Sequence, residues 1–275
     1  NASDFDDDAD DGGLFWPYRV RIAAEGRFTK NVSAWIEFQN ASVAGGTDVL
    51  GNPPTSHNGI GGLLFNDRGA VEMYQGNLTL DQLWSKNFSL RLGRQEIVAG
   101  NELLLGDLDF YAGLSHDGGV GNWKLKKVNL MLWYTRPFEG QVLPGLGAGN
   151  VSPDQEVIVP ATGSGTQHFW GAYATWNFKK ATNLDLYLMS LSNRGTGANF
   201  QTFGGRYAHD TTGKGVFYNV EVALQTGQVA SELLTGPDVD ASGMAVEGWF
   251  GYQWKAGKNT HRIFGRLEMA TGDDG

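Results

Sequence analysis

The 275-residue chain contains no cysteine and no uninterrupted run of about 18 apolar residues. The first absence excludes a disulfide framework and thiolate metal sites, and the second excludes a hydrophobic transmembrane helix. Basic residues are also in deficit, because 21 lysines and arginines stand against 30 aspartates and glutamates and give a formal net charge of −9. This acidity argues against nucleic acid as a partner. The mean hydropathy of −0.30 is compatible with a transmembrane β-barrel, whose strands alternate apolar and polar residues.

A period of two residues runs through almost the whole chain. In the stretch NVSAWIEFQN, residues 31–40, apolar side chains occupy every second position, which is the alternation of a β-strand. No segment shows a clear 3.6-residue period, so the sequence predicts an all-β chain. About twelve strands are expected, at residues 18–28, 31–40, 71–80, 88–97, 118–124, 128–136, 168–178, 183–191, 202–209, 216–225, 245–255 and 262–270.

The connections between these strands alternate between short and long. The short turns each carry a lysine: Lys30, Lys86, Lys126, Lys180, Lys214 and Lys258. The connections between them are long at 41–70, 98–117, 138–166 and 228–243, and SNRGTGANFQ at 192–201 is intermediate. A Greek-key sandwich would not sort connection lengths in this way. An up-and-down barrel of an outer membrane does, with short periplasmic turns and long external loops.

The two faces of the predicted strands, one apolar and one polar, also favour a transmembrane barrel. Each apolar face has four or five alternate residues, which fits the roughly 9–11 residues of a tilted transmembrane strand. Aromatic residues gather near the strand ends, for example Trp84, Trp176 and Trp254, as in the girdles at membrane interfaces. The opposite faces carry charges that would cost about 2–4 kcal/mol each at mid-depth against lipid. Ordinary buried aromatics of a soluble β protein are the alternative, but these polar faces could not form a second core.

The sequence therefore predicts one transmembrane up-and-down antiparallel β-barrel domain over residues 1–275, with a water-filled lumen. The alternation of short and long connections places both chain ends on the external side, whereas barrels of this class normally keep both termini in the periplasm. We therefore expect additional strands on both sides of the chain and a barrel of about 14–18 strands. On this interpretation the acidic segment NASDFDDDADDGG is an external loop.

The segment 90–110 carries the most distinctive motifs. A strand ends in Gly93-Arg94-Gln95 and is followed by GNELLLGD at 100–107, His116-Asp117-Gly118, and then WYTRP at 133–137. These motifs, together with an acidic loop before RVRIAAEGRFTKNVSAWIEFQ, resemble the outer-membrane alginate-export family. The resemblance spans most of the chain.

The resemblance implies a barrel of about eighteen strands in the bacterial outer membrane, which passes an anionic polysaccharide such as alginate outward through a lumen narrowed by charged residues. It indicates residues 98–117 as an inward-folded constriction loop and transfers two motif positions, Arg94 and Asp107. A salt bridge between these two that pins the loop is the alternative, purely structural interpretation. Strand alternation adds arginines, and Glu96 follows the motif, so the predicted pore-lining set is Arg19, Arg21, Arg91, Arg94, Glu96, Asp107, Arg206, Arg262 and Arg266.

Arginine suits a uronate carboxylate because its planar fork makes two charge-assisted hydrogen bonds. Transport nevertheless requires weak sites in series, since a strong site would retain the polymer. Glutamates on the same predicted faces balance the arginines: Glu25, Glu37, Glu221, Glu247 and Glu268. This balance departs from a strongly cationic lumen and leaves room for a neutral glycan or small polar solutes.

The remaining polar clusters give no catalytic or cofactor site. The five histidines lie on separate segments without metal-ligand spacing, and the contiguous Ser115-His116-Asp117 cannot converge as a triad. We therefore expect no enzymatic activity. Carboxylates in the acidic run, Asp6, Asp8 and Asp10, could bind Ca²⁺, but the spacing of a dedicated calcium loop is missing and a solvated external loop is favoured.

The predicted partners are the lipid bilayer, lipopolysaccharide through bridging divalent cations, and polysaccharide or small polar solutes. The sequence does not fix the oligomeric state. A second function of another class stays open, namely a structural or adhesive outer-membrane scaffold whose lumen is plugged by residues 98–117.

Overall fold

The computed structural model describes residues 16–44, 71–107, 113–137, 167–193, 198–211, 213–229 and 239–272. These residues form one antiparallel sheet of twelve strands in which each strand pairs with its neighbours in sequence. The strands are β1 (Trp16–Thr29), β2 (Val32–Ala44), β3 (Glu72–Asp81), β4 (Phe88–Gln95), β5 (His116–Lys124), β6 (Val128–Pro137), β7 (Gln167–Lys179), β8 (Thr182–Asn193), β9 (Ala198–His209), β10 (Gly215–Val229), β11 (Val239–Ala256) and β12 (Asn259–Thr271). Among the described residues, no helix is long and apolar enough to cross a membrane.

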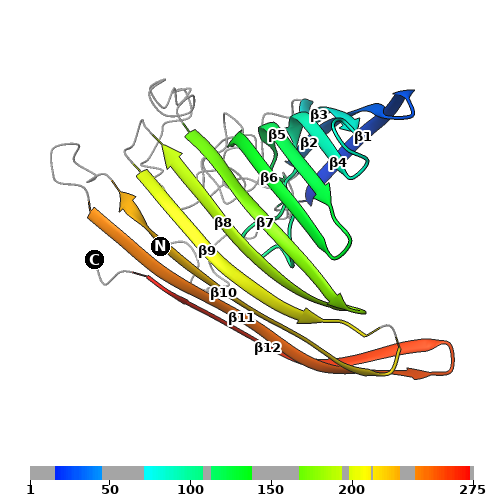
Figure 1. The fold of residues 1–275 in the computed structure, drawn as a ribbon, viewed down its shortest axis with the longest axis vertical. Helices are drawn as coiled ribbons and strands as arrows, with labels where there is room; N and C mark the ends of the chain where they lie inside the picture. Colours follow the sequence, from blue (N-terminus) through cyan, green and yellow to red (C-terminus); the bar gives the residue numbers. More distant parts are fainter. Residues whose placement is uncertain are drawn as a thin grey trace, which may run out of the picture.

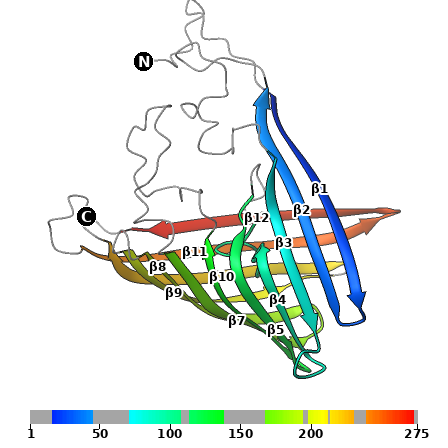
Figure 2. The ribbon, with the colours of Figure 1, turned by 90° about the horizontal axis from the view of Figure 1, so that it is seen from above.

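The sheet is strongly curled rather than flat. In Figure 1 the strands run side by side in sequence order, and Figure 2 shows the β1–β2 hairpin standing across the direction of β11 and β12. Within the described residues β1 and β12 form the two edges of the sheet. The expectation of further strands stays a prediction.

All twelve predicted strands are confirmed, although their ends differ by up to six residues, as at β11, which begins at Val239 and not at residue 245. β4 ends at Gln95, two residues earlier than predicted, and the chain leaves the sheet there. At this point the side-chain amide of Gln95 donates hydrogen bonds to the backbone carbonyls of Gly93 (3.2 Å) and Gly118 (3.1 Å). β5 begins at His116, so residues 116–117 of the predicted loop belong to a strand. The connection between β8 and β9 is shorter than predicted, since only residues 194–197 separate them.

The two faces of the sheet carry opposite kinds of side chain. On the outer, convex face large apolar side chains are exposed, such as Ile22 (71%), Leu186 (57%) and Phe250 (63%). On the inner face polar side chains are buried, such as Asn219 and Glu247. An apolar exposed surface of this extent is unfavourable in water and is the surface that a lipid bilayer covers. The predicted alternation of faces is therefore confirmed.

Aromatic rings line the outer face near the short turns. Phe178 and Tyr207 stack at 6.0 Å between ring centroids, and Tyr207 lies 5.6 Å from Tyr218. On the next hairpin, Trp254 stacks on His261 at 5.5 Å. Such amphipathic rings suit the level of the lipid headgroups, so this band marks one membrane interface.

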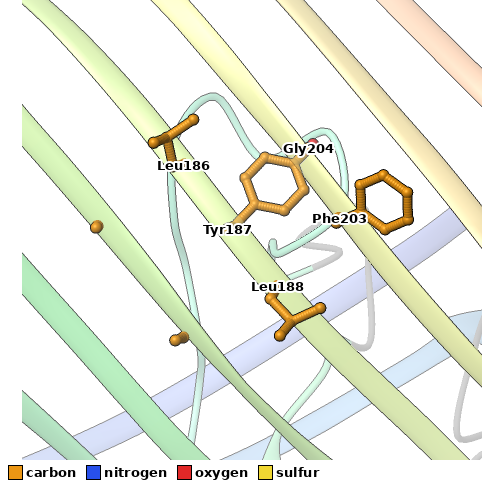
Figure 3. A pocket seen from close by; sticks show the side chains of 7 residues that line it. Leu186, Tyr187, Leu188, Phe203 and Gly204 are labelled. Atoms are coloured by element: carbon orange, nitrogen blue, oxygen red, sulfur yellow. The ribbon is translucent and has the colours of Figure 1, made fainter.

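Glycines on the inner face allow aromatic rings to lie flat on the sheet. A Cβ atom added to Gly204 would overlap the carbonyl oxygen of Val222 and approach the Tyr187 hydroxyl oxygen to 2.5 Å. Figure 3 shows the Tyr187 ring beside Gly204; Leu186, Leu188 and Phe203, also labelled there, alternate with these two residues and are exposed on the outer face. These residues, together with Ala172 and Ala174, line a hollow of about 420 Å³ in the wall. The absence of a side chain at Gly204 therefore determines how Tyr187 packs.

We expect Gly204→Ala to lower the free energy of unfolding by about 1–3 kcal/mol, the usual cost of inserting a methyl group into a packed site. The matched control is Gly265→Ala on β12, where an added Cβ meets no atom within 4 Å. Denaturant unfolding in detergent, followed by heat-modifiable gel mobility, measures both. Equal stability of the two variants would contradict this account of the Tyr187 packing.

Candidate functional site

The chain that follows β4 folds over the inner face of the sheet; we call residues 96–107 the inward segment. Its tight turn is closed by backbone hydrogen bonds from Ala99 to Leu105 (2.9 Å) and from Glu102 to Ala99 (3.1 Å). Ile97 and Leu105 are only 1% and 5% exposed. They pack against an apolar patch on the inner wall, formed by Val120, Trp133, Phe169, Tyr173, Tyr187, Met189 and Ala223. Burial of each such side chain contributes about 1.5–3 kcal/mol. The strand pattern predicted a polar inner face, but the structure shows that this face also carries an apolar patch.

Glycine lets the tip of the inward segment approach the opposite wall. Gly100 has φ +64°, and an added Cβ would lie 2.5 Å from the Tyr173 hydroxyl oxygen and 3.3 Å from Arg206 Nε. The next residue, Asn101, donates a hydrogen bond from Nδ2 to the Glu247 carboxylate on β11. The segment therefore leaves β4 and reaches a strand seven places further along the sheet.

A first polar cluster lies between β1, β4 and the start of the inward segment. The Arg21 guanidinium lies 3.8 Å from a carboxylate oxygen of Glu37 and 3.8 Å from one of Glu96, and it stacks over the Tyr74 ring at 3.9 Å. Arg91 donates to the Glu96 backbone carbonyl at 3.0 Å. Burial raises the pKa of the Glu96 carboxyl, with Asp107 adding to the rise and Arg21 opposing it. The cluster holds cations and carboxylates in near balance.

A second polar cluster is centred on Asp185, whose side chain is fully buried on the inner face of β8. Asp185 accepts hydrogen bonds from the Tyr173 hydroxyl (2.8 Å), the Asn183 amide (3.0 Å) and Arg206 Nε (2.7 Å). Arg206 also donates to the Asn219 side chain at 3.0 Å. Neutral side chains therefore hydrogen-bond to both members of this ion pair, the Asp185 carboxylate and the Arg206 guanidinium. A buried ion pair needs such additional hydrogen bonds to be stable.

The same pattern continues toward β12. Glu247 accepts hydrogen bonds from Asn101 and from Arg266, and Arg266 also contacts Glu268. Arg262 lies 3.1 Å from Asp210 near the short turns. The inner arginines of this region are thus already matched with carboxylates, and the wall presents mixed rather than positive charge.

The structure divides the predicted pore-lining residues into groups. Arg21, Arg91 and Glu96 come together in the first cluster, and Asp107 lies beside it. Arg206 belongs to the second cluster, with Arg262 and Arg266 further along the wall, and Arg19 shares the inner face with Arg21.

Arg94 differs from the other predicted arginines. It alternates with Gln95, whose side chain is buried on the inner face, and it donates two 2.8 Å hydrogen bonds to Asp117. The register of β4 and β5 pairs these two residues directly. Arg94 therefore lies on the outer face, near the loop end of the strand, and is held by the carboxylate of the neighbouring strand.

Sequence alternation could identify Asp185, Glu221 and Glu247 as inner residues, but not as partners of particular arginines, because strand register is a tertiary property. The inner aromatic residues Tyr173 and Tyr187 were missed, since an aromatic residue on a polar face has no periodic signal. Asn101 was missed as a site residue because a loop has no period at all.

The predicted calcium ligands Asp6, Asp8 and Asp10 lie outside the described residues, and the calcium site stays a prediction. In the part of the chain that the structure describes, no three or more His, Cys, Asp or Glu side chains are grouped so that they could hold a metal ion.

A family model described as alginate export matches residues 18–275. The chain belongs to the alginate export family. As a member of it, the protein is an outer-membrane channel for alginate or polar solutes. Comparison with curated proteins gives no significant match.

The solved structures that match this chain are distant from it in sequence. An anion-selective porin from Comamonas acidovorans matches with a TM-score of 0.43 and 12% identity over 93% of this chain and 79% of that porin. A loop L8 deletion mutant of OmpT, an outer membrane protein of Vibrio cholerae, matches with a TM-score of 0.41 and 10% identity over 95% of this chain and 91% of that mutant chain.

We expect Asp185→Ala to cost about 3–5 kcal/mol of unfolding free energy, because it leaves the Arg206 guanidinium buried without its carboxylate. The exposed pair Arg27–Glu25 (2.9 Å) is the control, and Glu25→Ala should change stability by less than about 1 kcal/mol. The double variant Asp185→Leu with Arg206→Met should recover much of the loss. Denaturant titration of the refolded barrel measures all three, and a double variant no more stable than Asp185→Ala would contradict the assignment.

Proposed function

We propose that the channel conducts an anionic polysaccharide and that the inward segment narrows its lumen. The observation that carries this proposal is the contact between Asn101 of the inward segment and Glu247 of β11, a strand distant from β4 in the sheet. A segment held at both β4 and β11 lies over the inner wall, where a permeating chain has to pass. No catalytic role, cofactor, or nucleic-acid partner is part of the proposal.

The mixed charge of the wall suits a polymer that has to move. Arg21, Arg206 and Arg266 each have a carboxylate within 4 Å. A uronate carboxylate therefore competes with an existing partner at each site, so its net gain is small. A channel needs weak sites in series, since a tight one would stop transport.

The second candidate function, a scaffold with a plugged lumen, is favoured by the apolar contacts of Ile97 and Leu105, since these anchor the inward segment firmly. The two candidates differ in one measurable property. A channel passes a steady current in a planar bilayer, whereas correctly folded protein with no current would indicate the scaffold.

We expect Asn101→Ala to raise the single-channel current of the full-length protein while lowering the unfolding free energy by about 1.5–3 kcal/mol, the value of one hydrogen bond to a charged group. The current should rise because the tip of the inward segment loses its hold on β11. The exposed Glu102→Ala on the same turn is the control. Unchanged current in Asn101→Ala, with wild-type folding, would show that this contact does not narrow the lumen.

Block of the current by soluble polyuronate should depend on the inner arginines and not on Arg94. Arg266→Gln removes a half-exposed inner cation and should raise the half-blocking concentration about two- to five-fold, as expected for one partly screened charge contact. Arg94→Gln removes the same charge from the outer face and serves as the matched control. An uncharged dextran should not block, and equal effects of the two substitutions would argue against a polymer path along the inner wall.

A further inference from the structure

The lysines of the 275-residue chain are confined to one edge of the sheet. All ten lie in the six short turns or at the strand ends beside them: Lys30, Lys86, Lys124, Lys126, Lys127, Lys179, Lys180, Lys214, Lys255 and Lys258. The antiparallel order brings the six turns to the same edge (Figure 1), and every one of these lysines is exposed. We call this set the lysine edge.

Few carboxylates neutralise the lysine edge. Asp210 is paired with Arg262 at 3.1 Å, and Glu25 with Arg27 at 2.9 Å, so an arginine already neutralises much of the charge of each. Asp81 lies at the end of β3. The chain as a whole has a formal charge of −9. The positive charge is therefore concentrated at the short-turn mouth, in an otherwise acidic protein.

Two of the strand-end lysines lie on the inner side of the wall. Lys124 is in register with Asn129 and shares the face of the fully buried Val120. Lys255 follows the buried Gln253 by two residues on β11. Their neighbours Trp123 and Trp254 are exposed on the outer face with the aromatic band. These two ammonium groups consequently face the mouth of the lumen rather than the lipid.

Lys124 also borders a cavity of about 280 Å³ between the inner wall and the inward segment. Val98, Ala99 and Gly100 line it from the segment, and Asn122, Asn129 and Thr175 supply polar groups from the wall. An ammonium group beside amide and hydroxyl groups matches an acidic sugar, whose carboxylate needs a cation and whose hydroxyls need donors and acceptors.

We propose that the lysine edge is the site where the channel captures a polyuronate chain, with Lys124 and Lys255 as its inner members and the cavity beside Lys124 as a subsite for one sugar. This inference rests on the proposed function. Lysine is a hydrated, flexible point charge, so it attracts a polyanion without holding it in a fixed geometry. Short turns of outer-membrane barrels face the periplasm, which places the capture site on the side from which an exported polymer arrives.

The test is one-sided block of the full-length channel by polyuronate in a planar bilayer. The 275-residue chain contains no cysteine. In a full-length background from which any other cysteine has been removed, Asn87→Cys in the β3–β4 turn, probed with an impermeant thiol reagent, identifies the chamber that the short turns face. Lys124→Glu with Lys255→Glu should raise the half-blocking concentration from that chamber at least about ten-fold. Lys30→Glu with Lys258→Glu makes the same charge change at turn tips and should have a clearly smaller effect.

Three results would overturn the capture site. Equal effects of the two pairs would mean that net charge alone matters. Equal block from both chambers would mean that the site is not at this mouth. A difference seen only in bilayers with anionic phospholipid would mean that the lysines contact lipid headgroups.

A second readout separates this inference from the proposed function. Binding of uronate oligomers to the folded protein in detergent, measured by calorimetry at about 0.1 M and 1 M salt, should weaken steeply as the Debye length falls from about 10 Å to 3 Å. Wild-type binding by the Lys124→Glu and Lys255→Glu variant overturns the capture site even if the channel conducts. Absence of any current, with oligomer binding that the variant loses, overturns the proposed channel but supports the capture site.

Discussion

Each strand of this sheet has to match two different surroundings at once. The outer residues meet hydrocarbon and the inner residues meet polar groups, so the period-two alternation sets which residue types each position accepts. Charges such as Asp185 and Glu247 can be kept only on the inner face, where they find partners. The same constraint fixes the register, since a slip of one residue would turn every such charge toward lipid.

The charges that lie on the inner face have to be neutralised there. The arginines meet carboxylates across strands, as in the pairs Arg206–Asp185 and Arg266–Glu247, and Tyr173 adds a neutral donor to the first of these. Desolvation makes an unpaired inner charge costly, so a charge-balanced wall is the outcome that the fold favours. A charge-balanced wall also has no region that binds a charged polymer strongly, because no long stretch of the wall carries charge of a single sign.

The sequence was sufficient for every property that follows from alternation. The twelve strands and the polar residues of the inner face could be predicted. So could the alternation of short and long connections, except between β8 and β9, where only residues 194–197 separate the strands. The motifs of residues 90–110 led to the family. The partner of each charge could not be predicted, because a pair such as Asn101 and Glu247 depends on how a non-periodic loop folds back. Arg94 shows the same limit, since its motif suggested the pore while its strand position puts it beside Asp117 on the outer face.

The separation of lysine from arginine follows the same physical logic. Arginine forms planar, multiply bonded pairs and suits the crowded inner wall, as Arg206 does with Asp185 and Asn219. Lysine is more strongly hydrated and suits an edge that stays in water. A polyanion approaching from the short turns would therefore meet mobile charges first and compensated charges afterwards. Long-range attraction is then strongest where the polymer arrives and weakest where it has to slide, an arrangement that favours both capture and passage.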